Sequence, residues 1–167
     1  MADPEHFREY VVGRYAALVR TAWLLTGDFA SAEDLVQVAL LKAWRRWSTL
    51  RENPDAYVRR ILVNTKITWW RRRSAGEEPS AVLPERVSDD QFQTVEARRD
   101  VMALLACLPR QQRAVLVLRY YEDLSEEETA ELLGCSVGTV KSHASRGLAA
   151  LRLATARSDR TETMEGR

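Results

Sequence analysis

The sequence predicts an all-α fold, with two small helical domains joined by an acidic, flexible linker. Apolar residues recur mostly at intervals of three and four, and only 5 prolines and 7 glycines interrupt 167 residues. Residues 74–93 break this pattern, because they carry Pro79, Pro84 and several acidic side chains. We therefore expect domains over 5–73 and 94–153, a linker over 74–93 and a disordered tail over 154–167.

The composition points away from a membrane, a metal site and an enzyme. No apolar run approaches the roughly 20 residues that a membrane helix needs, and the start lacks a signal-peptide layout, so we expect a cytoplasmic protein without membrane insertion. Cys107 and Cys135 suit a reducing compartment, and we expect both to be packing residues. Neither has a Cys or His at metal-ligand spacing. No catalytic constellation, cofactor motif or phosphate-binding glycine loop is present.

The net charge of +1 hides an asymmetry between the front of the chain and the linker. Residues 1–73 hold 13 Lys and Arg against 8 Asp and Glu, whereas residues 74–93 hold 1 against 5. A basic front block attracts polyanions such as nucleic acid. The alternative is a solvated helical surface, and charge alone does not decide between the two.

The front domain is expected to contain four helices, including 5–25, 32–47 and 54–73. Ser31 and Asp34 have the spacing of a capping box that opens the second of these helices. Leu41 and Trp44 lie on its polar side, which indicates either a second buried face or a docking surface. Helix geometry leaves these two alternatives open.

The helix 54–73 interleaves basic residues with aromatic ones. Such a helix suits single-stranded nucleic acid, because arginines hold phosphates while aromatic rings stack on unpaired bases. The alternative is a core helix whose basic last turn is favoured by the helix dipole. That alternative accounts for Arg71, Arg72 and Arg73 better than for Arg59 and Arg60 in the middle of the helix.

The back domain ends in a predicted helix-turn-helix. Ser125 and Glu128 form a capping box, Gly134 follows the end of that helix, and Ser136 caps the next one. An apolar stripe of the last helix points inward: Val137, Val140, Ala144 and Leu148. Small polar and basic residues point outward or lie at the flank: Gly138, Thr139, Lys141, Ser142, Ser145 and Arg146. This outer face suits a DNA major groove, where backbone can come close; a structural helical hairpin is the alternative.

Two motifs together resemble bacterial RNA polymerase sigma factors. The segment 33-EDLVQVALLKAW-44 is similar to their polymerase-binding helix, and residues 109–152 are similar to their −35-reading domain. The segment 53-NPDAYVRRILVNTKITWWRRR-73 is similar to the helix that handles the −10 element. Having only these two domains resembles the extracytoplasmic-function subfamily (sigma-70 family, group 4). The turns 26-TGD-28 and 52-ENPDAYVRR-60 resemble an actinobacterial branch.

The resemblance implies a role for each group of residues. Those facing the β′ clamp helices of the polymerase would be Asp34, Gln37, Leu41 and Arg45. Those binding −10 DNA, together with the loop 48–53, would be Tyr57, Arg59, Arg60, Asn64, Arg71, Arg72 and Arg73. Those binding −35 DNA would be Ser136, Gly138, Thr139, Lys141, Ser142, Ser145 and Arg146. Val38 stands where most relatives carry an acid.

The resemblance also implies partners. They are core RNA polymerase, through its β′ clamp helices and β flap, and promoter DNA, with an anti-sigma factor in many relatives. The free protein would be a monomer, and its acidic linker would thread toward the polymerase active-site channel. A free-standing helix-turn-helix regulator that dimerises on a palindrome is the main alternative, and a helical adaptor that binds no DNA is a second.

Overall fold

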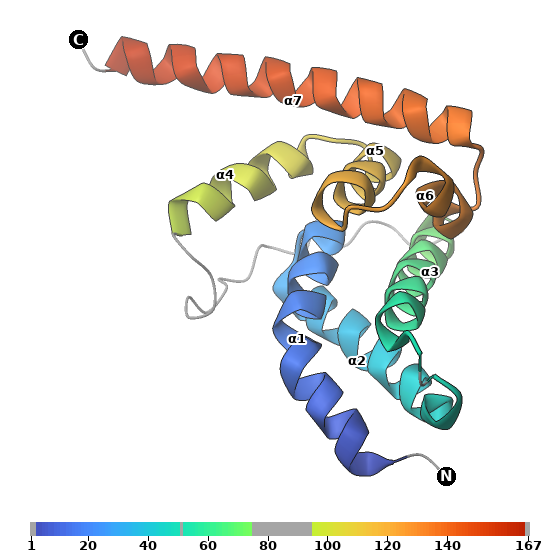
Figure 1. Ribbon diagram of the computed structural model, residues 1–167. Coiled ribbons are helices and arrows are strands. Elements are labelled where there is room, and N and C mark those ends of the chain that lie inside the picture. The colour runs from blue at the N-terminus through green and yellow to red at the C-terminus, as the bar shows by residue number, and fades with distance from the viewer. Residues whose placement is uncertain (1–2, 51, 75–94, 166–167) are drawn as a thin grey trace. The chain divides into compact units, whose positions relative to one another are not determined.

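The computed structural model describes residues 3–50, 52–74 and 95–165, and the chain divides into two compact units, Met1–Gln91 and Phe92–Arg167 (Figure 1). Every regular element within these ranges is helical, which confirms the all-α class. The predicted linker lies outside the described residues except for Ser74, which ends a helix.

The first unit consists, in its described part, of three α-helices and one 3₁₀ turn. The elements are α1 (Pro4–Thr26), α2 (Phe29–Arg45), the turn η1 (Trp47–Thr49) and α3 (Pro54–Ser74). Helix α2 packs against both α1 and α3, and its Leu35 and Val36 are fully buried with Leu62 of α3. The described part of this unit thus holds three α-helices where the sequence predicted four.

Helix α2 begins one turn earlier than the sequence predicts. Asp28, not Ser31, is its N-cap, and Oδ2 of Asp28 accepts a hydrogen bond from the Ser31 backbone N–H at 2.8 Å. Asp caps a helix as well as Ser does, and Phe29 and Ala30 continue the helical spacing. Burial by itself raises the pKa of the Asp28 carboxyl, but hydrogen bonds from Ser31 and Ala30 and the charge of Lys66 outweigh it and lower that pKa.

The second unit is built around the long helix α7. Its elements are α4 (Val95–Ala106), α5 (Arg110–Leu116), the π turn η2 (Val117–Tyr121), α6 (Glu126–Leu133) and α7 (Val137–Glu165). Helix α7 packs against α4, α5 and α6. Gly147 permits the approach to α5, because a Cβ added there would lie 2.9 Å from Cδ1 of Leu116.

The local signals of the helix-turn-helix are confirmed. Ser125 and Glu128 form a reciprocal capping box, with hydrogen bonds of 2.8 and 3.0 Å between backbone N–H groups and side-chain oxygens. Gly134 ends α6 in the left-handed conformation at φ 65°, which a side chain would strain. Oγ of Ser136 accepts from the Thr139 backbone N–H at 3.1 Å and so caps α7.

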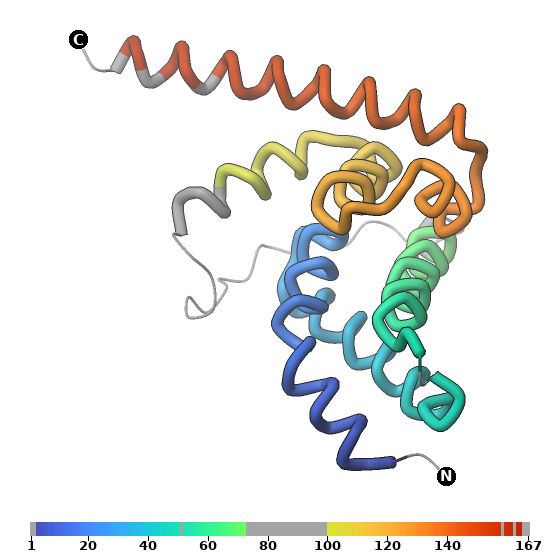
Figure 2. The backbone as a smooth tube through the Cα atoms, in the orientation of Figure 1, coloured from blue at the N-terminus to red at the C-terminus, as the bar shows by residue number. Residues whose placement is uncertain are grey.

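The tail predicted to be disordered is helical as far as Glu165. Figure 2 shows α7 as one long helix that runs on toward the C-terminus, and its bounds, Val137–Glu165, take in most of the predicted tail. No Pro or Gly interrupts the sequence between Gly147 and Gly166, and extending a formed helix is easier than nucleating one. The polar composition led to a wrong prediction of disorder, because a polar segment that continues a packed helix can extend it without a new nucleation step.

The two cysteines differ. Cys135 packs against the buried cluster of Val115, Ala130 and Val140, and burial raises the pKa of its thiol. Cys107 is exposed, so its expected packing role is wrong. It follows the last residue of α4, where the chain turns away from the helix, and its Sγ donates to the Ala103 carbonyl at 3.3 Å.

None of the described helices is long and apolar enough to cross a membrane. Among the same residues, no three His, Cys, Asp or Glu side chains gather in a way that could hold a metal ion.

Candidate functional site

Helix α2 presents a continuous exposed stripe on the side away from its core. Its members are spaced three, four and four residues apart, so they share one face of the helix: Asp34, Gln37, Leu41 and Arg45. All four are exposed, and Leu41 keeps 55% of its surface accessible. The structure thus brings the four predicted polymerase-binding residues together, around an apolar side chain that nothing in the described part of the unit covers.

Trp44 does not belong to this stripe. Its ring lies 5.0 Å from that of Phe7 in α1, and the residue is half-buried. The two alternatives for the polar side of α2 therefore apply to different residues. Trp44 completes the packing of α1 on α2, whereas Leu41 remains on a free surface.

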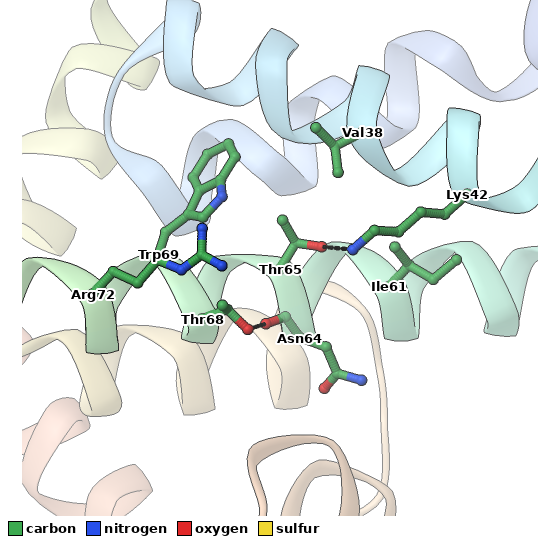
Figure 3. A pocket seen from close by; sticks show the side chains of 8 residues that line it. All are labelled: Val38, Lys42, Ile61, Asn64, Thr65, Thr68, Trp69 and Arg72. Carbon is green, nitrogen blue, oxygen red and sulfur yellow. Dashed lines mark hydrogen bonds between the residues drawn. The ribbon is translucent and has the colours of Figure 1, made fainter.

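A cavity of about 290 Å³ opens between α2 and α3 (Figure 3). Helix α2 contributes Val38 and Lys42, and α3 contributes the rest of the lining: Ile61, Asn64, Thr65, Thr68, Trp69 and Arg72. Nζ of Lys42 donates to Oγ1 of Thr65 at 3.4 Å, which spans the two helices. Lys42 and Thr65 are not among the site residues predicted from the sequence, because no pattern within one helix shows which residues face each other across two helices.

The cavity combines positive charge with apolar surface. Its lining holds the cations Lys42 and Arg72, the indole of Trp69 and no carboxylate. Such a surface suits an anionic group that carries a flat apolar part, as a nucleotide does. The Thr68 hydroxyl donates to the Asn64 backbone carbonyl at 2.9 Å, whereas the Asn64 side-chain amide points away from this bond (Figure 3).

The predicted −10 residues divide between two sides of α3. Arg60, Asn64, Arg71 and Arg72 are exposed and Tyr57 is half-buried on the same side, which the helical repeat confirms. Arg59 lies about 140° around the helix from Asn64, on the side that faces α1. It is half-buried, and its charge acts on Tyr10 of α1. The side chain of Arg73 lies outside the described residues.

Residues of α1 contact the chain on both sides of the predicted −10 loop. Rings of His6, Phe7 and Tyr10 lie 5.3, 4.9 and 5.0 Å from the ring of Trp47, which is 3% exposed. After the loop, Oδ1 of Asp55 accepts from the Tyr10 hydroxyl at 2.8 Å and from Nε of Arg14 at 3.0 Å. Burial, followed by the bond to Asp55, raises the pKa of Tyr10 well above its usual value.

The outer face of α7 is small and polar, as predicted. Six residues on this face or at the start of the helix are exposed: Ser136, Gly138, Lys141, Ser142, Ser145 and Arg146. Thr139 is half-buried, with its hydroxyl 2.9 Å from that of Ser136. On the inner face Val140 is fully buried, and Val137 and Ala144 pack against the same cluster. The structure therefore brings all seven predicted −35 residues to one surface.

An ion pair flanks this surface. Nζ of Lys141 lies 3.5 Å from Oε2 of Glu126, at the start of α6. Both side chains reach solvent, so the pair contributes little to stability.

Comparisons with known proteins cover both units. Residues 11–76 match the family model Sigma-70 region 2, and residues 98–151 match Sigma-70, region 4. RNA polymerase sigma-E factor of Streptomyces coelicolor is 44% identical over 154 residues, which is 91% of this chain and 87% of that protein. The chain belongs to the extracytoplasmic-function sigma factors of the sigma-70 family. This similarity to a Streptomyces protein agrees with the resemblance of the turns of this chain to an actinobacterial branch.

Further relatives agree with this assignment. The extracytoplasmic-function RNA polymerase sigma factor SigL of Mycobacterium tuberculosis is 32% identical to this sigma factor over 145 residues, covering 83% of this chain and 82% of that one. Among solved structures, the sigma factor RpoE in complex with the anti-sigma factor NepR, from Bartonella quintana, matches with a TM-score of 0.69 and 28% identity. That match covers 89% of this chain and 95% of the other.

Proposed function

We propose that this sigma factor binds core RNA polymerase and directs it to promoters, reading duplex −35 DNA with α6 and α7 and capturing melted −10 DNA with α3. The observation that carries the proposal is that three separate exposed faces, on α2, α3 and α7, each have the chemistry of a different partner surface. The match of both units to the sigma-70 regions supports the same assignment of separate functions to the two units.

The α2 stripe is the proposed polymerase-docking surface. Leu41 offers an exposed apolar centre, and Asp34, Gln37 and Arg45 surround it with polar groups. Interfaces commonly have this arrangement, in which a few apolar anchors supply most of the binding energy within a polar rim. We propose the β′ clamp helices as its partner, and the β flap as a partner of the second unit.

The α7 outer face is the proposed −35 reader. Gly138, Ser142 and Ser145 let the helix backbone approach base edges closely, and Lys141 and Arg146 can reach bases or phosphates. The buried Val140 fixes which face turns outward. Ser136 and Thr139 at the helix start lie where backbone N–H groups favour a phosphate.

Helix α3 and its preceding loop are the proposed −10 site. An unpaired base leaves the stack and is held by Tyr57, Arg60 and Asn64, while Arg71 and Arg72 contact phosphates. Arg73 is proposed with them from the sequence alone. Arg59, because it faces α1, is the member of this group that the geometry supports least.

Two modest DNA sites gain affinity from being held together. Bound to the polymerase, the two units would engage one promoter, so that the second contact forms at a high effective concentration. The free protein is then expected to bind promoter DNA weakly. The acidic linker is proposed to run toward the active-site channel.

An anti-sigma factor is a further proposed partner. The sigma factor RpoE of B. quintana is 28% identical to this chain, and its structure was solved in complex with the anti-sigma factor NepR. Isolation of the tagged chain from its own cells, followed by mass spectrometry, would identify such a protein as a stoichiometric companion distinct from polymerase subunits.

The decisive experiment combines the purified chain with bacterial core RNA polymerase and a pool of genomic promoter fragments. Co-elution with the core enzyme and new transcript start sites are expected, and alignment upstream of those sites yields the −35 and −10 elements. Tight binding to duplex DNA without any association with core enzyme would instead favour the free-standing helix-turn-helix regulator.

A further inference from the structure

The first three turns of α1 contribute no buried side chain of their own to the unit. The buried residues of α1 begin only at Leu18, and most side chains before Val11 are exposed. Three aromatic side chains of these turns do make tertiary contacts. The rings of His6, Phe7 and Tyr10 all pack against the ring of Trp47. Apart from the contact of Phe7 with Trp44 of α2, these turns therefore pack against the segment between α2 and α3.

That segment is held at both ends by α1. Before it, Trp47 is inserted among the α1 rings with 3% of its surface exposed. After it, Oδ1 of Asp55, in the first turn of α3, accepts hydrogen bonds from Tyr10 at 2.8 Å and from Arg14 at 3.0 Å. Tyr10 takes part in both contacts, so one residue of α1 links the two ends.

Asn53 adds a local restraint. Its side-chain Oδ1 accepts from the Ala56 backbone N–H at 3.2 Å, immediately before Pro54 opens α3. The helix start is thus set by its own cap, and α1 sets where that start lies relative to Trp47. The chain between these two points is the loop proposed to receive the unstacked −10 base.

We propose that Tyr10, Arg14 and Asp55 are positioning residues for −10 capture, forming a latch that fixes the two ends of the α2–α3 connection, at Trp47 and Asp55, before DNA arrives. This inference rests on the proposed function. Ordering a residue of free chain opposes binding by about 1–2 kcal/mol, so a connection whose two ends are already fixed leaves more of its contact energy for the DNA. None of the three residues needs to touch DNA.

The test uses the full chain bound to core polymerase and a promoter fragment whose non-template −10 strand is unpaired and carries 2-aminopurine. Tyr10→Phe removes only the hydroxyl and is expected to weaken binding of this fragment about two- to tenfold, the effect of one lost hydrogen bond. Arg14→Gln is expected to act in the same direction. Binding of duplex −35 DNA and co-elution with core enzyme should stay unchanged.

A matched control separates positioning from general stability. Val19→Ala truncates a buried α1 residue five positions beyond Arg14, and we expect it to lower Tm by removing core packing. If Val19→Ala weakens −10 binding as much as Tyr10→Phe does at an equal loss of Tm, the latch is merely structural and the proposal is overturned. Wild-type affinity of both Tyr10→Phe and Arg14→Gln would overturn it as well.

A double-mutant cycle tests whether Tyr10 acts through its hydrogen bond to Asp55. Tyr10→Phe combined with Asp55→Ala should weaken −10 binding no further than Asp55→Ala alone, because Asp55→Ala already removes the acceptor of the Tyr10 hydroxyl. Additive losses would contradict the latch. If the wild-type holoenzyme shows no preference for unpaired −10 DNA, the proposed function itself fails, a result distinct from an unaffected Tyr10→Phe variant.

Discussion

The exposed faces of α3 and α7 are both rich in arginine or lysine, yet they differ in shape. The α7 face carries glycine and serine residues, whose small size leaves the helix backbone accessible. The α3 face carries Tyr57, Trp69 and long arginines beside a cavity of about 290 Å³. A smooth, shallow face suits the regular groove of a duplex, and a hollowed aromatic face suits bases that have left their stack. Side-chain size, more than charge, therefore distinguishes the two proposed nucleic-acid surfaces of this protein.

A third face, on α2, differs from both because its centre is apolar. Replacing this centre with a charge, in Gln37→Ala combined with Leu41→Asp, is expected to weaken association with core polymerase by about 2 kcal/mol or more. The physical reason is the loss of an apolar anchor and the burial of an unpaired carboxylate. Co-elution and competition binding measure the effect, and circular dichroism checks that the helices persist.

Val12→Asp is the matched control for that variant. Val12 is also an exposed apolar residue of the first unit, at 78% accessibility, but it lies on α1 away from the stripe. Its replacement should leave polymerase binding intact. Equal losses for the two variants would contradict the assignment of docking to α2.

The basic residues of the α7 face allow the next test. Lys141→Ala and Arg146→Ala are each expected to weaken −35 DNA binding by about 1–3 kcal/mol where a base-edge contact is lost. Footprinting and transcription from templates with altered −35 sequence measure the loss. Arg157→Ala removes the same charge about 16 Å further along α7 and should have a much smaller effect.

The cavity face is tested by the Asn64 side chain. Asn64→Ala should shorten the lifetime of open complexes by removing a contact worth about 1 kcal/mol, while closed-complex binding stays near wild type. Thr68→Ala is the neighbouring control, because the Thr68 hydroxyl is already committed to the backbone of its own helix. Unchanged open-complex lifetimes for Asn64→Ala would remove that residue from the −10 site.

The smallest expected effect concerns the smooth shape of the α7 face. Gly138→Ala has room in the fold, since the added Cβ would lie 3.8 Å from Oγ of Ser136, and it should stabilise the second unit by up to about 1 kcal/mol. The same methyl group stands on the proposed DNA-facing side, so −35 binding should fall although stability rises. Gly13→Ala meets nothing within 4 Å and should stabilise α1 without changing −35 binding.

The sequence alone determined much of this architecture. The helical periodicity, the capping box at Ser125, the turn at Gly134 and the inward stripe of α7 all depend on neighbours a few residues apart, and the structure confirms each of them. The exposed stripe of α2 follows from the same local rule. Patterns of this kind predict which face of a helix is polar.

Tertiary structure alone decided which polar faces stay uncovered. Trp44 and Leu41 look alike on a helical wheel, but Phe7, far away in sequence, packs against only one of them. Arg59 and Arg60 are neighbours, but only helix packing places α1 beside Arg59, which is half-buried while Arg60 stays exposed. The latch at Asp55 joins residues 41 and 45 positions apart. Such contacts depend on how separate helices pack, and no periodicity within a single helix contains that information.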